Sequence, residues 1–211
     1  INPLVADWDS RSSPSWRNFL DDQLAPRIAL EYRKTEQAHL SLGLPGLSIT
    51  HPDRHVLDLV SVILGEGMSS RLFLEMRERQ GLAYDVHSGV THFLDCGAFI
   101  VNAGVDPIRV QTALDTILAE LSRMKNPVTE EDLQMAKQLT IGRLLLRMEG
   151  TRPVAGWIGM HETLLGQIPE IQSVIDSIKS VTVEDLQRES VRLLNATKLN
   201  LALVGPVRED T

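Results

Sequence analysis

The chain has 211 residues, of which 43% are hydrophobic, and a formal net charge of −7 at pH 7. This length is enough to bury a large core, in one domain or in two small ones. The charges are spread along the chain without a basic cluster, which argues against nucleic-acid binding, because that needs several lysines or arginines placed against phosphates. No stretch approaches the ~20 apolar residues of a membrane span, so we expect a soluble protein.

Residues 1–26 combine three prolines with polar residues and two tryptophans, and they show no sustained periodicity. This composition is typical of a linker or an N-terminal arm. The sequence therefore predicts a single folded domain over residues 27–211.

Two strands are predicted at the start of this domain, over residues 27–32 and 37–44. In the second, four apolar residues alternate with polar residues or glycine: Ala38, Leu40, Leu42 and Leu44. A period of two is typical of a strand that is buried on one face only. Pro45 and Gly46 end this strand.

A helix, a second short helix and a hairpin follow. Start signals near Asp53 and a stop at Gly65 bound the first helix, and the second is expected from about Ser69 to Arg79. Gly81 is the expected turn after it. Residues 83–93 and 97–105 then read as two antiparallel strands.

The second half is mainly helical. Helices are predicted over residues 110–124, 130–148, 152–166, 169–178 and 183–194, and residues 198–205 return as a strand. The near copies TEEDLQ at 129–134 and TVEDLQ at 182–187 are explained by helix capping, since each has a threonine followed three positions later by an acidic residue. This order predicts an α+β fold, with helices packed on one face of a mainly antiparallel sheet.

Common hydrolytic motifs do not occur in the sequence. There is neither an H-E-x-x-H nor an H-x-x-E-H motif, and His51 and His55 in HPDRH have Pro52 between them and no glutamate, which favours a helix start over a metal site. The glycines near Ser69 lack the lysine of a phosphate-binding loop. Cys96 is the single cysteine and cannot form an internal disulfide. We therefore expect no metal site in this chain. We also expect no catalytic residue in this chain alone.

Arg77 and Tyr84 are the candidate binding residues. They lie seven positions apart with Gly81 between them, the first near the end of a predicted helix and the second at the start of a predicted strand. Both side chains could therefore face one cleft. A guanidinium and a phenol can each donate a hydrogen bond to a carbonyl oxygen that becomes an oxyanion during acyl transfer.

At these residues the sequence resembles the pitrilysin-type, or inverzincin, zinc metallopeptidases. The run ILGEGMSSRLFLEMRERQGLAYDVHSG at 63–89 is similar to the signature of their second, non-zinc-binding domain. Three other segments support the resemblance elsewhere in the chain: QAHLSLGLPG, DCGAFIV and NLALVGP. It implies a sheet of about six strands with helices on one side. It also implies that Arg77 and Tyr84 bind the substrate backbone and stabilise the tetrahedral intermediate, while another domain or subunit holds zinc.

On this resemblance, we expect the chain to be inactive alone, because it lacks H-x-x-E-H. Its expected partners are a zinc-bearing domain or subunit and an unfolded peptide, in a homo- or hetero-oligomer. The compartment, bacterial cytoplasm or periplasm, stays open. The alternative is a non-catalytic structural or peptide-binding module of the same fold. A third question is whether residues 38–44 or 97–104 form a free strand edge that could pair with a peptide, or whether both are ordinary interior strands.

Overall fold

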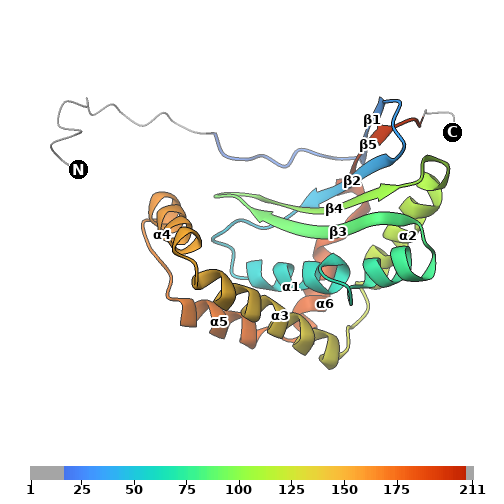
Figure 1. Cartoon of the computed structure of the whole chain (residues 1–211). Coiled ribbons are helices and arrows are strands. Elements are labelled where there is room, and N and C mark those ends of the chain that lie inside the picture. Colours follow the sequence, from blue (N-terminus) through green and yellow to red (C-terminus); the bar gives the residue numbers. More distant parts are fainter. Residues whose placement is uncertain (1–16, 208–211) are drawn as a thin grey trace.

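A computed structural model describes residues 17–207 of the chain. Within them, five strands form one sheet in the order β1-β5-β2-β4-β3 (Figure 1). β1 and β5 pair in parallel, and the other neighbours are antiparallel. The strands are β1 (Arg27–Tyr32), β2 (Ala38–Pro45), β3 (Ala83–His92), β4 (Gly97–Val105) and β5 (Asn200–Gly205).

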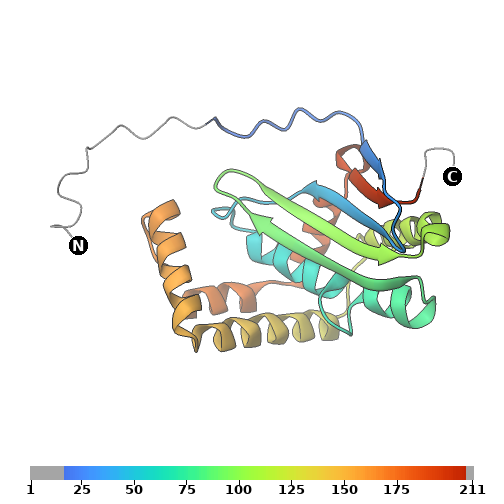
Figure 2. The same ribbon diagram turned by 45° about the horizontal axis from the view of Figure 1, so that its top comes forward.

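The helices lie on one face of this sheet (Figures 1 and 2). Along β2, Ala38, Leu40, Leu42 and Leu44 are all buried, whereas His39 between them is exposed. Phe99, Val101 and Ala103 of β4 are buried in the same alternating manner. The period of two in the sequence therefore separates a core face from an open face.

The helical layer contains one helix from the first half of the chain and most of the second half. The longer helices are α1 (Arg54–Gly65), α2 (Val110–Arg123), α3 (Glu130–Met148), α4 (Thr151–Leu165), α5 (Ile171–Ser180) and α6 (Val183–Leu193). Shorter helical segments are η2 (Phe73–Arg79), η3 (Pro107–Arg109) and η4 (Ala196–Lys198). α4 projects from one end of the layer (Figure 2). No helix of the described part is long and apolar enough to span a bilayer.

The two threonine caps form as predicted. Thr129 accepts a hydrogen bond from the backbone N–H of Asp132 at 3.0 Å, at the start of α3. Thr182 and Asp185 form a reciprocal capping box at the start of α6. Capping satisfies backbone donors that have no partner within the helix. It therefore accounts for both six-residue sequences without an internal repeat.

The α+β class with a mainly antiparallel sheet is confirmed. The described residues contain five strands, where the resemblance implied about six. β2 and β4 both lie inside the sheet, so the hypothesis of a free edge at 38–44 or 97–104 is wrong, and the two edges are β1 and β3. The sequence pattern could not show which strands lie at the edges of the sheet. Alternation indicates which face of a strand is buried, but not which strands lie on either side of it.

Residues 1–16 of the predicted arm lie outside the described part. Residues 17–26 form no helix or strand, but they are anchored on the domain. The buried Gln23 donates from Nε2 to the carbonyls of Thr197 and Leu199 at 3.2 and 3.1 Å. Lys198 donates to the Gln23 carbonyl at 2.7 Å.

Candidate functional site

Arg77 and Tyr84 flank a turn that leads from η2 into β3. η2 is wound as a π-helix, and the N–H of Gln80 closes it by donating to the carbonyl of Glu75 at 3.1 Å. Gly81 follows with φ of 57°, in the left-handed region that favours glycine. The N–H of the buried Leu82 donates back to the Met76 carbonyl at 2.6 Å. These bonds fix the path of the chain between the two candidate residues.

Arg109, at the end of η3, holds this turn from outside. Its Nη1 donates to the carbonyl of Gly81 at 3.0 Å, and its Nη2 donates to the carbonyl of Gln80 at 3.2 Å. A planar guanidinium can bind two neighbouring acceptors at once, which an ammonium group cannot do with the same geometry. Arg109 therefore fixes the turn by a two-point contact.

Tyr84 lies on a bulge at the start of β3. Ala83 pairs with Val105, Asp85 pairs with Gly104, and the register shifts between them. Ala83 and Val86 are both buried although they are three positions apart, a spacing that a regular strand cannot place on one face. The bulge absorbs the extra residue. As a result, Tyr84 and Asp85 are both exposed, and Tyr84 retains 61% of its accessible surface.

Arg77 lies in the last turn of η2 and is exposed. Its guanidinium carbon is 5.1 Å from the centre of the Phe73 ring, one helical turn earlier, within the range of a cation–π contact. Within residues 17–207, neither the Arg77 nor the Tyr84 side chain has a hydrogen-bond or ion-pair partner, whereas the side chain of the neighbouring Arg79 pairs with Glu75 at 2.8 Å. The two candidates are therefore available to an external acceptor.

A separate polar network connects α1 to the far end of β3. Asp58 contacts His55 Nδ1 at 3.2 Å through one carboxylate oxygen and His92 Nε2 at 3.1 Å through the other. His92 Nδ1 also lies 2.7 Å from the Leu47 carbonyl. Both neighbours of the His92 ring are acceptors, so the ring satisfies both only as an imidazolium with two N–H donors.

The pKa values of this network follow its hydrogen bonds. Burial opposes the charged form of His92, but the bonds to Asp58 and to the Leu47 carbonyl outweigh it and raise the pKa of His92 above its ordinary value. Burial likewise opposes ionisation of Asp58, and the bonds from His55 and His92 outweigh it and lower its pKa. No group of three or more histidine, cysteine, aspartate or glutamate side chains in the described part could hold a metal ion.

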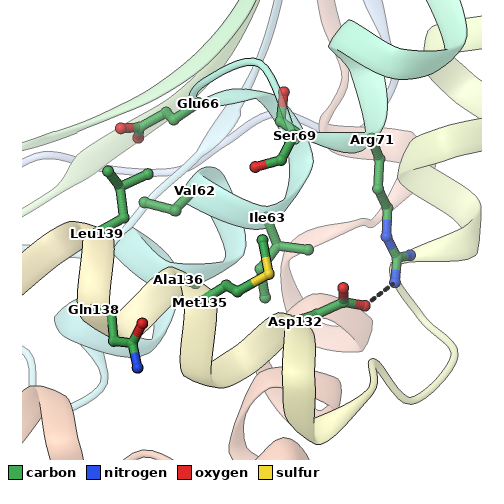
Figure 3. A pocket seen from close by; sticks show the side chains of 11 residues that line it. Val62, Ile63, Glu66, Ser69, Arg71, Asp132, Met135, Ala136, Gln138 and Leu139 are labelled. Atoms are coloured by element: carbon green, nitrogen blue, oxygen red, sulfur yellow. Dashed lines mark ion pairs between the residues drawn. The ribbon is translucent and has the colours of Figure 1, made fainter.

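A hollow of about 450 Å³ lies between α1 and α3, on the helical side of the domain (Figure 3). Val62 and Ile63 of α1 line it opposite Met135 and Leu139 of α3. Neither Arg77 nor Tyr84 lines it, whereas Arg71 and Asp132, which form an ion pair of 3.8 Å, both do. The hollow is therefore a gap in the packing between these two helices.

The structure thus places the two residues chosen from the sequence on either side of one turn. Sequence reasoning missed Arg109 and the bulge. Arg109 is 28 residues from Gly81 along the chain, and nothing in the local pattern DPIR signals its target. The bulge could have been suspected, because Ala83, Val86, Ser88 and Val90 break the strict alternation of β3 at its first step.

The structure defines an α+β domain with helices on one face of a mainly antiparallel sheet, and residues 17–207 contain no cluster of side chains suited to a metal ion. The family model described as "Peptidase M16 inactive domain" matches residues 1–140. The chain therefore belongs to the peptidase M16 inactive domain family.

Relatives of this chain are named as zinc proteases. An uncharacterized zinc protease of Streptomyces coelicolor is 37% identical over 186 residues, which are 88% of this chain and 40% of the relative. An uncharacterized zinc protease of Bacillus subtilis is 33% identical over 175 residues, 82% of this chain and 42% of the relative. The chain spans less than half the length of these relatives.

Solved structures share the fold. A protease from Helicobacter pylori superposes with a TM-score of 0.85 at 22% identity, over 93% of this chain and 48% of that one. A peptidase M16 inactive domain from Pseudomonas fluorescens superposes with a TM-score of 0.77 at 25% identity, over 86% of this chain and 44% of that one.

Proposed function

We propose that this chain is the substrate-binding, zinc-less domain of an M16-type zinc metalloendopeptidase. In this role it closes over an unfolded peptide that another domain or subunit holds at a zinc ion. The names of the relatives support this proposal, as does the short span of the chain within them. The observation that carries it is the pair Arg77 and Tyr84, exposed and without internal polar partners on either side of a fixed turn.

The chemistry follows from the donors that this pair offers. Attack on a peptide carbonyl moves negative charge onto its oxygen, and donors already oriented towards that oxygen lower the barrier. The Arg77 guanidinium supplies charged N–H groups, and the Tyr84 phenol supplies one O–H donor. Zinc, held outside this chain, would supply polarisation of the same carbonyl and of the attacking water.

Substitution of the pair tests this role in the protein assembled with its zinc-bearing segment. Arg77→Ala and Tyr84→Phe should each reduce kcat about 10²-fold, the scale of losing one oxyanion donor. Zinc content should be unchanged, because neither residue would bind the metal. Peptide cleavage and zinc stoichiometry are measured on the same preparations.

The chain offers a matched control for each substitution. Arg79→Ala removes an arginine from the same helix that is already paired with Glu75. Tyr32→Phe removes the hydroxyl group of the other tyrosine in the sequence, on β1. Both controls should retain wild-type turnover. Wild-type turnover in Arg77→Ala and Tyr84→Phe would instead favour a non-catalytic structural or peptide-binding module.

A further inference from the structure

The open face of the sheet carries a hollow next to Tyr84. Its volume is about 300 Å³, and its lining comes from β2, β3, β4 and β5 together with Gln37, which precedes β2. Asp85, which directly follows Tyr84 in the chain, is one of the lining residues. The bulge that exposes Tyr84 also exposes Asp85, so the proposed backbone-binding residue directly precedes a residue that lines the hollow.

Three polar side chains along the hollow form a chain of hydrogen bonds. His87 Nδ1 is 3.2 Å from Asp85 Oδ2, and Asn102 Nδ2 is 3.3 Å from His87 Nε2. A carboxylate only accepts and an amide nitrogen only donates, so one assignment fits: His87 donates from Nδ1 to Asp85 and accepts at Nε2 from Asn102. Asp85 Oδ1 and Asn102 Oδ1 remain as acceptors.

Gly104 forms the floor between Asp85 and His39. It is the cross-strand partner of His39 on one side and of Asp85 on the other. A methyl group built on Gly104 would lie 3.2 Å from Gln37 Oε1 and 3.5 Å from the His39 ring. The missing side chain at this position is therefore what leaves the hollow open between the three strands.

Asp85 gives the hollow a negative charge. Asp85 is the one carboxylate among its lining residues, and no lysine or arginine of the described part lines it. Unused acceptors beside a carboxylate suit a ligand with several N–H donors and a positive charge. The Asp85 side chain keeps 73% of its accessible surface, so its attraction for a cation is that of a screened surface pair.

We propose that this hollow is a subsite that receives a lysine or arginine side chain of the bound peptide. A peptide whose backbone lies against Tyr84 would bring a nearby side chain to Asp85, because the two residues are adjacent and both exposed. This inference rests on the proposed function for the placement of the peptide. It adds a preference for a cationic residue, which the Arg77 and Tyr84 pair by itself does not give.

Binding of paired peptides to the assembled protein tests the subsite. The probes are fluorescent peptides in which a lysine, or a norleucine of similar length without charge, occupies each position in turn. Zinc is removed with a chelator so that the peptides stay intact, and affinity is read by anisotropy. At one position lysine should bind about three- to fivefold more tightly than norleucine, the scale of an exposed ion pair. Raising the salt to about 0.5 M should reduce this preference.

Two variants locate the preference. Asp85→Asn, which keeps the shape and removes the charge, should bring the lysine-to-norleucine ratio to about one. Gly104→Val, which fills the floor, should do the same, and far-ultraviolet circular dichroism establishes that it is folded. Asp115→Asn removes a carboxylate from the exposed side of α2 and should leave the ratio at its wild-type value. Equal binding of both peptides by the wild type, or a preference that persists in Asp85→Asn, would overturn the proposal.

The subsite and the proposed function fail in different ways. If Arg77→Ala retains full turnover while the lysine preference depends on Asp85, the oxyanion role is wrong and the subsite stands. If Arg77→Ala loses turnover while Asp85→Asn keeps the lysine preference, the subsite is wrong and the oxyanion role stands.

Discussion

Arg109 shows how a residue outside the proposed binding pair can control it. The turn at Gln80 and Gly81 determines how η2 and β3 approach each other, and hence where Arg77 and Tyr84 lie. Both carbonyls of the turn are held by one guanidinium, at 3.2 and 3.0 Å. Because a small displacement of an oriented donor lowers catalysis strongly, we expect Arg109 to act as a positioning residue for the proposed binding pair.

Arg109→Lys should therefore impair turnover without removing a donor to the substrate. Lysine keeps the charge but loses the two-point contact, so we expect kcat to fall about tenfold. The amide of Leu82, which is bonded to Met76 across the turn, should exchange faster with solvent. Hydrogen exchange followed by mass spectrometry measures the effect on the turn, and a peptide-cleavage assay measures kcat. Arg33→Ala, which removes an exposed arginine paired with Glu31, is the control, and unchanged exchange at Leu82 in Arg109→Lys would contradict the role.

At the scale of elements, the joint between α1 and β3 depends on a glycine. Gly65, the last residue of α1, lies against Ser88 of β3, and a methyl group on Gly65 would come within 2.5 Å of the Ser88 backbone nitrogen. Ser88 is buried and donates to the Ser61 carbonyl at 2.8 Å. Neither the helix nor the strand can move away without breaking this buried contact.

Gly65→Ala should destabilise the domain by about 2–4 kcal/mol, because the overlap is with backbone and forces a shift in a packed core. Gly142→Ala is the matched control: a methyl group there meets nothing within 4 Å inside α3. That change should stabilise the protein by about 0.5–1 kcal/mol through helix propensity. Urea unfolding measures both effects. Equal stabilities for the two variants would exclude the steric account.

The elements that the sequence predicted well are those in which burial follows a period. Alternating leucines predict β2, and threonine caps predict α3 and α6, because these signals are local. The π-helical winding of η2 and the bulge at Tyr84 depend on distant partners such as Arg109 and the register of β4. The residue types of the candidate pair were accessible from sequence, whereas the contacts that orient the pair were not.

At the scale of the whole molecule, the His92 network links segments that the sheet alone does not hold. Asp58 lies on α1, His92 ends β3, and the Leu47 carbonyl follows β2. The folded-state pKa of His92 is raised above its ordinary value of 6.5, and that of Asp58 is lowered below 3.8. The network therefore stabilises the fold fully between these two ordinary values, where His92 is charged and Asp58 is ionised.

Stability should therefore depend on pH through His92. The folded state binds the His92 proton more tightly than the unfolded chain, so the contribution is complete below about pH 6.5 and is lost as the pH rises through the folded-state pKa. His92→Gln should lower the free energy of unfolding more at about pH 5.5 than at about pH 8.5, since the wild type loses this contribution at the higher pH. Asp58→Asn should remove the same pH dependence, because it removes the carboxylate that favours the imidazolium. Urea titrations of the three proteins across this range measure the differences, and a deficit in His92→Gln that stays constant with pH would show that the ring contributes by packing alone.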